Sequence, residues 1–159
     1  MLTVQTLLLA LLCVSASGGA PHQGVRVVDA VNVTAARDEA SHSFAGEGSS
    51  LGETAGRKWR SAEGWFSYSL RIYEDSPLTL VCTLADGGGA RESFDILVDD
   101  QKAASCIRGP GESSAAEMTV SLPLARTAGR TAVVVRFQAH AGSRTARLLE
   151  LRSVQEHFE

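Results

Sequence analysis

Residues 65–73 read WFSYSLRIY, and this stretch alternates strictly between two kinds of side chain. One face of the extended chain would carry large apolar groups, at Phe66, Tyr68, Leu70 and Ile72. The opposite face would carry Trp65 and polar side chains. A period of two is typical of a β-strand with one buried face. We therefore expect a strand here, with Phe66 and Tyr68 in the core.

The same alternation recurs along the chain, at residues 78–84, 94–98, 102–107, 118–122 and 133–137. Turn-forming residues separate these stretches, as in the glycine run 87–89, the Asp99-Asp100 pair and the segment 108–111. Residues 148–151 fit either a strand or a short helix. Several short strands between turns are typical of an antiparallel β-sandwich. We expect an all-β fold of jelly-roll or galactose-binding-like type, in one domain over residues 22–156.

The N-terminal segment resembles a secretory signal peptide. An uncharged apolar run gives way to small residues, which predicts cleavage after Ala16, or as late as residue 20. An uncleaved anchor is the alternative, but the run is shorter than the roughly 20 residues that a spanning helix needs. We expect a secreted protein with no membrane association after cleavage.

Secretion affects how the cysteines and one asparagine are interpreted. Cys13 would leave with the signal peptide, so Cys82 and Cys106 could pair in an oxidising compartment. The alternative is two buried thiols that never meet, because a disulfide needs Cα atoms within about 7 Å. The Asn32-Val33-Thr34 sequon is a candidate N-glycosylation site if the host is eukaryotic.

Composition and motifs argue against several classes of function. The net charge is −3 and the basic residues are scattered, so we expect no nucleic-acid partner. No nucleophile elbow, phosphate-binding loop or HExxH helix is present in the sequence. The four histidines and the cysteines lack zinc-ligand spacing. We expect no catalytic residues, no metal and no cofactor.

Aromatic and basic residues gather in residues 56–70, GRKWRSAEGWFSYSL. Sugars are recognised by flat rings beside fixed polar groups, and an arginine can also stack on a ring. Trp59, Trp65 and Tyr68, next to Arg60, are therefore candidate carbohydrate-binding residues. The alternative is that these rings are core, as the alternation already suggests for Tyr68.

Three longer blocks carry a family resemblance: residues 38–70, residues 93–102 (SFDILVDDQK) and residues 133–143 (VVVRFQAHAGS). Together they resemble the C-terminal β-sandwich domain of family 127 and family 146 glycoside hydrolases, which include β-L-arabinofuranosidases. The resemblance runs from about Val28 to Val154. It implies that the polar segment 38–56, which by its residues alone would be a loop or a flexible lead-in, is ordered.

The resemblance also implies further site residues. His42, Glu47, Gln138 and His140 fall on the family's motif positions, as does Arg60, and all carry groups that a sugar could bind. The alternative for each is a structural hydrogen bond. The catalytic barrel of those enzymes, with its zinc-binding cysteines and catalytic glutamate, has no match in this chain, so hydrolase activity is not implied.

We therefore expect a secreted, non-catalytic carbohydrate-binding or accessory module, with arabinose-containing polysaccharides among its candidate ligands. The alternative is a structural module that docks on a glycoside hydrolase catalytic domain and binds no sugar of its own. A binding module should show a polar and aromatic cluster, whereas a docking module should show a broad apolar patch.

Overall fold

The computed structural model describes residues 24–33, 35–110 and 115–156. The predicted signal peptide, Cys13 and Thr34 of the sequon lie outside these residues. In the described part of the chain, no helix is long and apolar enough to cross a membrane. The elements in this part are β1 (Val25–Asn32), α1 (Ala36–Ser41), β2 (Ala45–Thr54), β3 (Arg57–Arg71), β4 (Leu78–Leu84), β5 (Glu92–Val98), β6 (Gln101–Arg108), β7 (Ala116–Leu122), the 3₁₀ turn η1 (Leu124–Arg126), β8 (Ala132–Ala139) and β9 (Leu148–Glu156).

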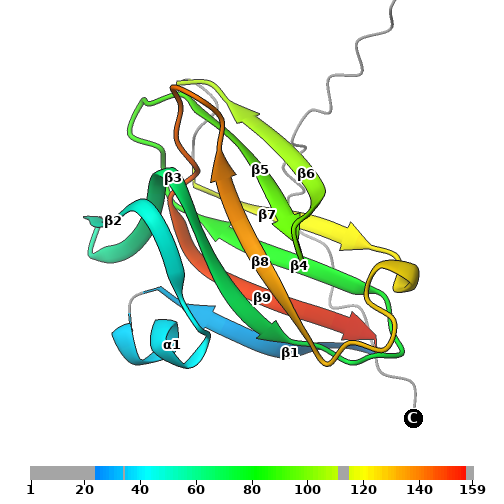
Figure 1. Cartoon of the computed structure of the whole chain (residues 1–159). Coiled ribbons are helices and arrows are strands. Elements are labelled where there is room, and N and C mark those ends of the chain that lie inside the picture. Colours follow the sequence, from blue (N-terminus) through cyan, green and yellow to red (C-terminus); the bar gives the residue numbers. More distant parts are fainter. Residues whose placement is uncertain (1–23, 34, 111–114, 157–159) are drawn as a thin grey trace, which may run out of the picture.

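The strands form two antiparallel layers that face each other (Figure 1). One layer has the order β2-β3-β8-β5-β6, and the other has the order β1-β9-β4-β7. The two layers are joined where Arg60 of β3 pairs with Leu148 of β9, so the sheet is nearly closed. This arrangement confirms the predicted all-β antiparallel sandwich of jelly-roll type.

The core lies between the layers and is built from the predicted strand faces. Phe66 and Tyr68 are fully buried, as expected from the alternation in residues 65–73. The ring of Phe66 stacks on that of Phe137 from β8, with centroids 4.9 Å apart. Phe94 of β5 packs against the same Phe137 ring. The other predicted apolar positions of β4, β5 and β8 are buried as well, at Leu78, Leu80, Cys82, Leu84, Ile96, Val98, Val133 and Val135.

Residues 148–151, which fitted either a strand or a helix, begin strand β9. This strand pairs with β1 on one side and with β4 on the other. The register with β4 shifts between Thr83 and Leu84, so that Leu149 is an extra residue in β9. Because of this bulge, Leu148 and Leu151 both join the core although they are three residues apart. The spacing of leucines that suggested a helix is therefore explained by a bulged strand.

The polar segment 38–56 is not a loop. It forms most of helix α1 and all of strand β2, and β2 pairs with β3 from Ala45 to Thr54. The two strands are joined by a tight turn in which Ala55 and Gly56 both have positive φ angles, of 51° and 75°, as a two-residue hairpin turn of type I′ requires. Most of β2 is exposed, so no apolar alternation marks it in the sequence.

The candidate disulfide between Cys82 and Cys106 does not form in this structure. Cys82 lies on β4 and Cys106 on β6, and these strands belong to different layers. Both side chains are buried. Burial raises the pKa of the Cys82 thiol to about 12. The alternative of two buried thiols is therefore the one that the fold adopts.

Candidate functional site

A row of side chains crosses the outer face of the β2-β3-β8-β5-β6 layer from edge to edge. The register pairs Glu47 with Trp65, Trp65 with Gln138, Gln138 with Asp95, and Asp95 with Ser105. Directly paired residues of antiparallel strands project to the same side. Because Phe66, Phe94 and Phe137 beside them point into the core, this row faces outward.

Trp65 stands between Glu47 and Gln138 in the row and is held by its neighbours. The guanidinium of Arg136 lies 4.0 Å from the centroid of the Trp65 ring, a cation–π contact. Arg136 Nη2 donates a hydrogen bond of 2.8 Å to Gln138 Oε1. Gln138 Nε2 in turn donates to the carbonyl oxygen of Gly64, at 3.3 Å. A half-buried ring and two polar side chains are thus fixed on one patch of the sheet.

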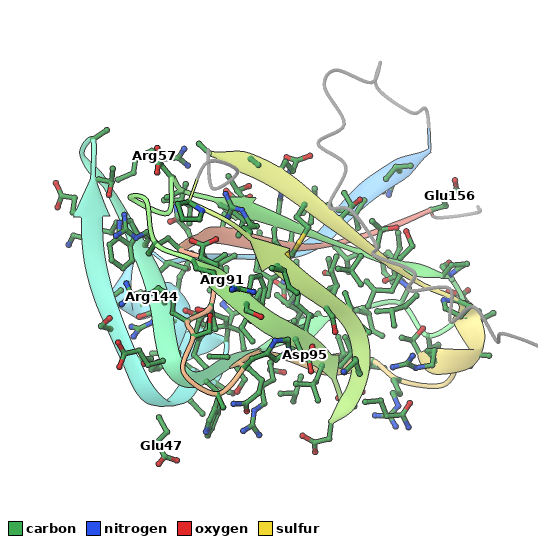
Figure 2. All side chains as sticks on the ribbon, turned by 90° about the horizontal axis from the view of Figure 1, so that it is seen from above. Glu47, Arg57, Arg91, Asp95, Arg144 and Glu156 are labelled. Carbon is green, nitrogen blue, oxygen red and sulfur yellow. The ribbon has the colours of Figure 1, made fainter. Side chains whose placement is uncertain are left out.

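Gly64 makes this arrangement sterically feasible. A Cβ atom at this position would lie 2.2 Å from the carbonyl oxygen of Glu47, a contact that real side chains do not make. The close approach coincides with a register shift at which two residues of β3, Glu63 and Gly64, stand opposite the single residue Gly48 of β2. The Glu47 side chain is exposed and projects away from the body of the protein (Figure 2).

Asp95 stands between Gln138 and Ser105 in the row and lies in the middle of the view in Figure 2. Its Oδ1 accepts hydrogen bonds from Ser105 Oγ at 2.5 Å and from His140 Nε2 at 2.8 Å. Lys102 Nζ lies 3.1 Å from its Oδ2. Partial burial raises the pKa of Asp95, but the bonds from Ser105, His140 and Lys102 outweigh this effect, and the net shift is downward.

His140 is fixed at both ring nitrogens. Since Nε2 faces the Asp95 carboxylate, Nε2 carries a proton, and Nδ1 lies 2.6 Å from Ser93 Oγ. The side chain remains 39% exposed. His140 therefore presents an oriented ring at the border of the row, next to the patch around Trp65 and Gln138.

Trp59, the other tryptophan of the candidate set, has a structural position in the β2–β3 hairpin. Its ring lies on Gly52, where a Cβ atom would be 2.2 Å from the ring. Its Nε1 donates to Thr54 Oγ1 at 2.9 Å. The guanidinium of Arg147 lies 4.4 Å from its centroid. With these contacts the ring braces the hairpin.

Arg60 and Tyr68, also candidates, belong to a buried network instead. Arg60 Nε and Nη2 donate to the two oxygens of Glu39 at 2.6 and 2.7 Å. Tyr68 Oη donates to Glu39 Oε1 at 2.6 Å. Tyr68 is fully buried, and Arg60 is only 7% exposed. Burial, together with the Glu39 carboxylate, raises the pKa of the Tyr68 hydroxyl. This network holds α1 against β3 and is not accessible to a sugar.

His42 lies in a separate polar cavity, which we call the Asp29 pocket. Its volume is about 300 Å³, and its lining residues are Asp29, Ser41, His42, Ser43, Ser69 and Arg71. His42 Nε2 is 3.1 Å from Asp29 Oδ1, and its Nδ1 is 2.7 Å from the carbonyl oxygen of Asp38. Burial raises the pKa of Asp29, but hydrogen bonds from Arg71 and His42 outweigh it, and the net shift is downward.

A second cavity, which we call the Arg144 pocket, lies at the other end of the molecule. Its volume is about 420 Å³, and its lining residues are Glu63, Arg91, Gly142, Ser143 and Arg144. Arg91 and Arg144 lie near each other in Figure 2. Arg144 Nη2 is 3.4 Å from Glu63 Oε1, and both side chains are well exposed. Within the described residues, no group of three or more His, Cys, Asp or Glu is arranged to hold a metal ion.

The structure thus brings together some of the predicted site residues and separates others. Trp65, Glu47 and Gln138 share one row, with His140 beside it. Trp59, Arg60, Tyr68 and His42 lie elsewhere. Arg136 was not among the predicted site residues, although alternation in residues 132–139 places it on the same face as Gln138. Asn32 is exposed at the end of β1, and glycosylation there stays a prediction.

Comparison with known proteins adds a family and a fold. Residues 24–154 match the family described as "Family of unknown function (DUF6805)". No curated protein matches the sequence.

Among solved structures, three carbohydrate-binding modules are similar in fold. The family 35 carbohydrate-binding module from an environmental isolate has a TM-score of 0.57 at 12% identity, over 80% of this chain and 96% of that one. The family 35 module from Clostridium thermocellum has a TM-score of 0.51 at 14% identity, over 82% and 96%. A CBM36 module in complex with calcium and xylotriose has a TM-score of 0.50 at 11% identity, over 70% and 92%.

Proposed function

The chain belongs to the DUF6805 family, and we propose that it is a non-catalytic carbohydrate-binding module whose ligand contacts Trp65. The observation that carries this proposal is the half-buried Trp65 ring, fixed by Arg136 at 4.0 Å in a row of polar side chains on the outer face of the sheet. The likeness in fold to carbohydrate-binding modules supports the same class of function.

The groups around Trp65 suit a hydroxylated, uncharged ring. The apolar C–H face of a sugar packs on an aromatic ring, while its hydroxyl groups need both donors and acceptors at fixed positions. Arg136 supplies donors, and Gln138 supplies a side-chain amide held by two further contacts. Glu47, directly across from Trp65, supplies an exposed carboxylate acceptor. Pre-positioned groups of this kind lose less conformational entropy when a ligand binds.

The finer parts of the proposal rest on the sequence. We propose that the module is secreted, on the basis of residues 1–16, and that it is related to the C-terminal domain of arabinofuranosidase-type glycoside hydrolases. Arabinose-containing plant or microbial polysaccharides are therefore the first ligands to test. A separate glycoside hydrolase catalytic domain is the partner that this relationship would imply.

The alternative, a docking module without sugar binding, requires a broad apolar surface. The large exposed apolar side chains of the described residues instead occur on five different elements, at Val25 and Val27 of β1, Leu51 of β2, Ile107 of β6, Leu124 of η1 and Val134 of β8. Scattered single apolar residues are normal for a protein surface. This distribution favours a binding module.

Affinity gel electrophoresis against a panel of arabinan, arabinoxylan, xylan and galactan tests the proposal. We expect retardation in at least one gel, and a loss of affinity of about 30-fold or more in Trp65→Ala, as for a central aromatic contact worth about 2 kcal/mol. Leu51→Ala is the matched control, because it removes a large apolar side chain that is 53% exposed, on the neighbouring strand. This control should bind like the native protein.

The same variants separate binding from folding. Since Trp65 is outside the core, Trp65→Ala should keep a thermal unfolding midpoint close to that of Leu51→Ala. Absence of retardation in every gel would contradict the proposal and favour the docking module. Equal loss of binding in both variants would show that Trp65 is not the contact.

A further inference from the structure

β3 contributes residues to both the Asp29 pocket and the Arg144 pocket, and Trp65 lies between these residues in the strand. Ser69 and Arg71 of β3 line the first pocket, and Glu63 of β3 lines the second. Ser69 and Arg71 are four and six residues from Trp65, so strand alternation puts both on its face, and Glu63, which is exposed, lies two residues before Trp65. In Figure 1, α1 lies toward the lower part of β3, and the loop that follows β8 lies toward its upper part.

The distance between the two pockets exceeds the length of a single sugar. Glu63 and Arg71 are eight residues apart in one strand, which corresponds to about 26 Å at a rise of roughly 3.3 Å per residue. Trp65 lies nearer to the Arg144 pocket, two residues from Glu63. A ligand that used only Trp65 would leave the Asp29 pocket empty.

The outward side chains of β3 between Trp65 and the Asp29 pocket are small. The outward positions of β3 in this interval are Ser67 and Ser69, two of the smallest polar side chains. Across from Ser67 on β2 stands Ala45, which is also small. Ser67 itself is only 6% exposed. On its other side stands Arg136 of β8, whose guanidinium lies over the Trp65 ring. An extended chain lying along β3 would therefore pass between Arg136 and Ala45 before it reached Ser69.

Both pockets carry the donors and acceptors that hydroxyl groups require. The Asp29 pocket offers the hydroxyls of Ser41, Ser43 and Ser69, and the Arg71 side chain, which is 78% exposed. The Arg144 pocket offers two guanidinium groups and the Glu63 carboxylate, which is 79% exposed. Neither pocket is lined by a Phe, Tyr or Trp side chain. The two pockets would thus hold sugar units by hydrogen bonds, and Trp65 would hold one by stacking.

From this geometry we infer that the module binds an internal stretch of a linear polysaccharide, laid lengthwise along β3 from the Arg144 pocket over Trp65 to the Asp29 pocket. The inference rests on the proposed carbohydrate-binding function and adds to it the class of ligand, a chain of several units rather than a terminal sugar. It also assigns Arg71 and Arg144 as binding residues at the two ends.

A size series of oligosaccharides tests this inference. Isothermal titration calorimetry with linear arabino-oligosaccharides and xylo-oligosaccharides, from the disaccharide to the octasaccharide, should show affinity that rises with length. The rise should reach about tenfold or more beyond the disaccharide, the effect of one or two additional net hydrogen bonds. Arg71→Ala and Arg144→Ala should each lower the affinity for the octasaccharide, and Arg71→Ala, at the end farther from Trp65, should leave that for the disaccharide unchanged.

Arg57→Ala is the matched control. Arg57 is an exposed arginine at the tip of the β2–β3 hairpin, away from both pockets (Figure 2). This variant should bind every length like the native protein, which separates the loss of a specific contact from the loss of one positive charge.

The outcomes distinguish this inference from the proposed function. If the disaccharide binds as tightly as the octasaccharide, and Trp65→Ala abolishes both, the lengthwise site is wrong while the carbohydrate-binding function stands. If the affinity rises with length but Arg71→Ala and Arg144→Ala have no effect, the chain runs in another direction and the inference is also wrong. If no oligosaccharide of either series binds and no polysaccharide retards the protein, both fail.

Discussion

The buried pair of Arg60 and Glu39 is expected to contribute more to stability than any single ion pair on the surface. Glu39 is only 6% exposed. In Arg60→Met, its carboxylate would lose two charge-assisted hydrogen bonds, of 2.6 and 2.7 Å. It would keep the hydrogen bond from Tyr68. Breaking a buried pair in this way costs about 3–5 kcal/mol. For a domain of this size, such a loss lowers the thermal midpoint by about 10–20 °C.

Urea unfolding of three proteins measures this effect: the native chain, Arg60→Met, and Arg60→Met/Glu39→Gln. Methionine keeps a long side chain against the ring of Phe44, which the Arg60 guanidinium covers at 4.0 Å. Glutamine removes the unpaired charge but still accepts from Tyr68, so the double variant should recover at least about 1 kcal/mol. A loss below about 1 kcal/mol in Arg60→Met, or a double variant no more stable than the single one, would refute the reasoning.

Three further predictions concern pH, packing and redox state. The pKa of Asp95 lies below its ordinary value of 3.8. The ionised carboxylate therefore stabilises the fold at pH values above 3.8. This contribution is lost as the pH falls through the pKa of the folded state. The difference in unfolding free energy between the native protein and Asp95→Asn should therefore shrink below about pH 4, and a difference that does not vary with pH would contradict this. Gly52→Ala should cost about 1–3 kcal/mol in chemical unfolding, because the new methyl group would displace the Trp59 ring; a cost below about 0.5 kcal/mol would show that the hairpin adjusts freely. Dithiothreitol should leave the thermal midpoint unchanged, whereas a disulfide between Cys82 and Cys106 would be lost on reduction and lower stability by about 2–4 kcal/mol.

Local periodicity was enough to predict the core strands. Phe66 and Tyr68 are buried because their strand has one face toward the opposite layer. Such a strand needs an apolar side chain at every second residue, which is visible in the sequence. Strand β2 could not be found in the same way, since both of its faces are largely exposed. Its stability comes from pairing with β3 and from the turn at Ala55 and Gly56, and neither produces an apolar pattern.

The candidate site was predicted only in part, because residue type does not show which partner a side chain meets. Arg60 and Trp65 stand five residues apart in the same aromatic and basic stretch. Arg60 is buried because it pairs with Glu39, which lies 21 residues earlier in the sequence. Arg136, which comes from β8, leaves Trp65 at the surface and braces it there. Both outcomes depend on contacts between distant segments, which composition and spacing do not encode.

The outer edge of β2 bears on how the protein behaves at high concentration. Within the described part of the chain, β2 pairs only with β3, so its other edge presents backbone groups to solvent, as in strands that recruit another copy and aggregate. The positive φ of 64° at Gly48, beside the register shift with β3, interrupts the regular spacing of those groups. Glu47 and Glu53 would bring like charges together if two such edges met. These features of β2 disfavour edge-to-edge association through the hairpin that lies beside the proposed binding face.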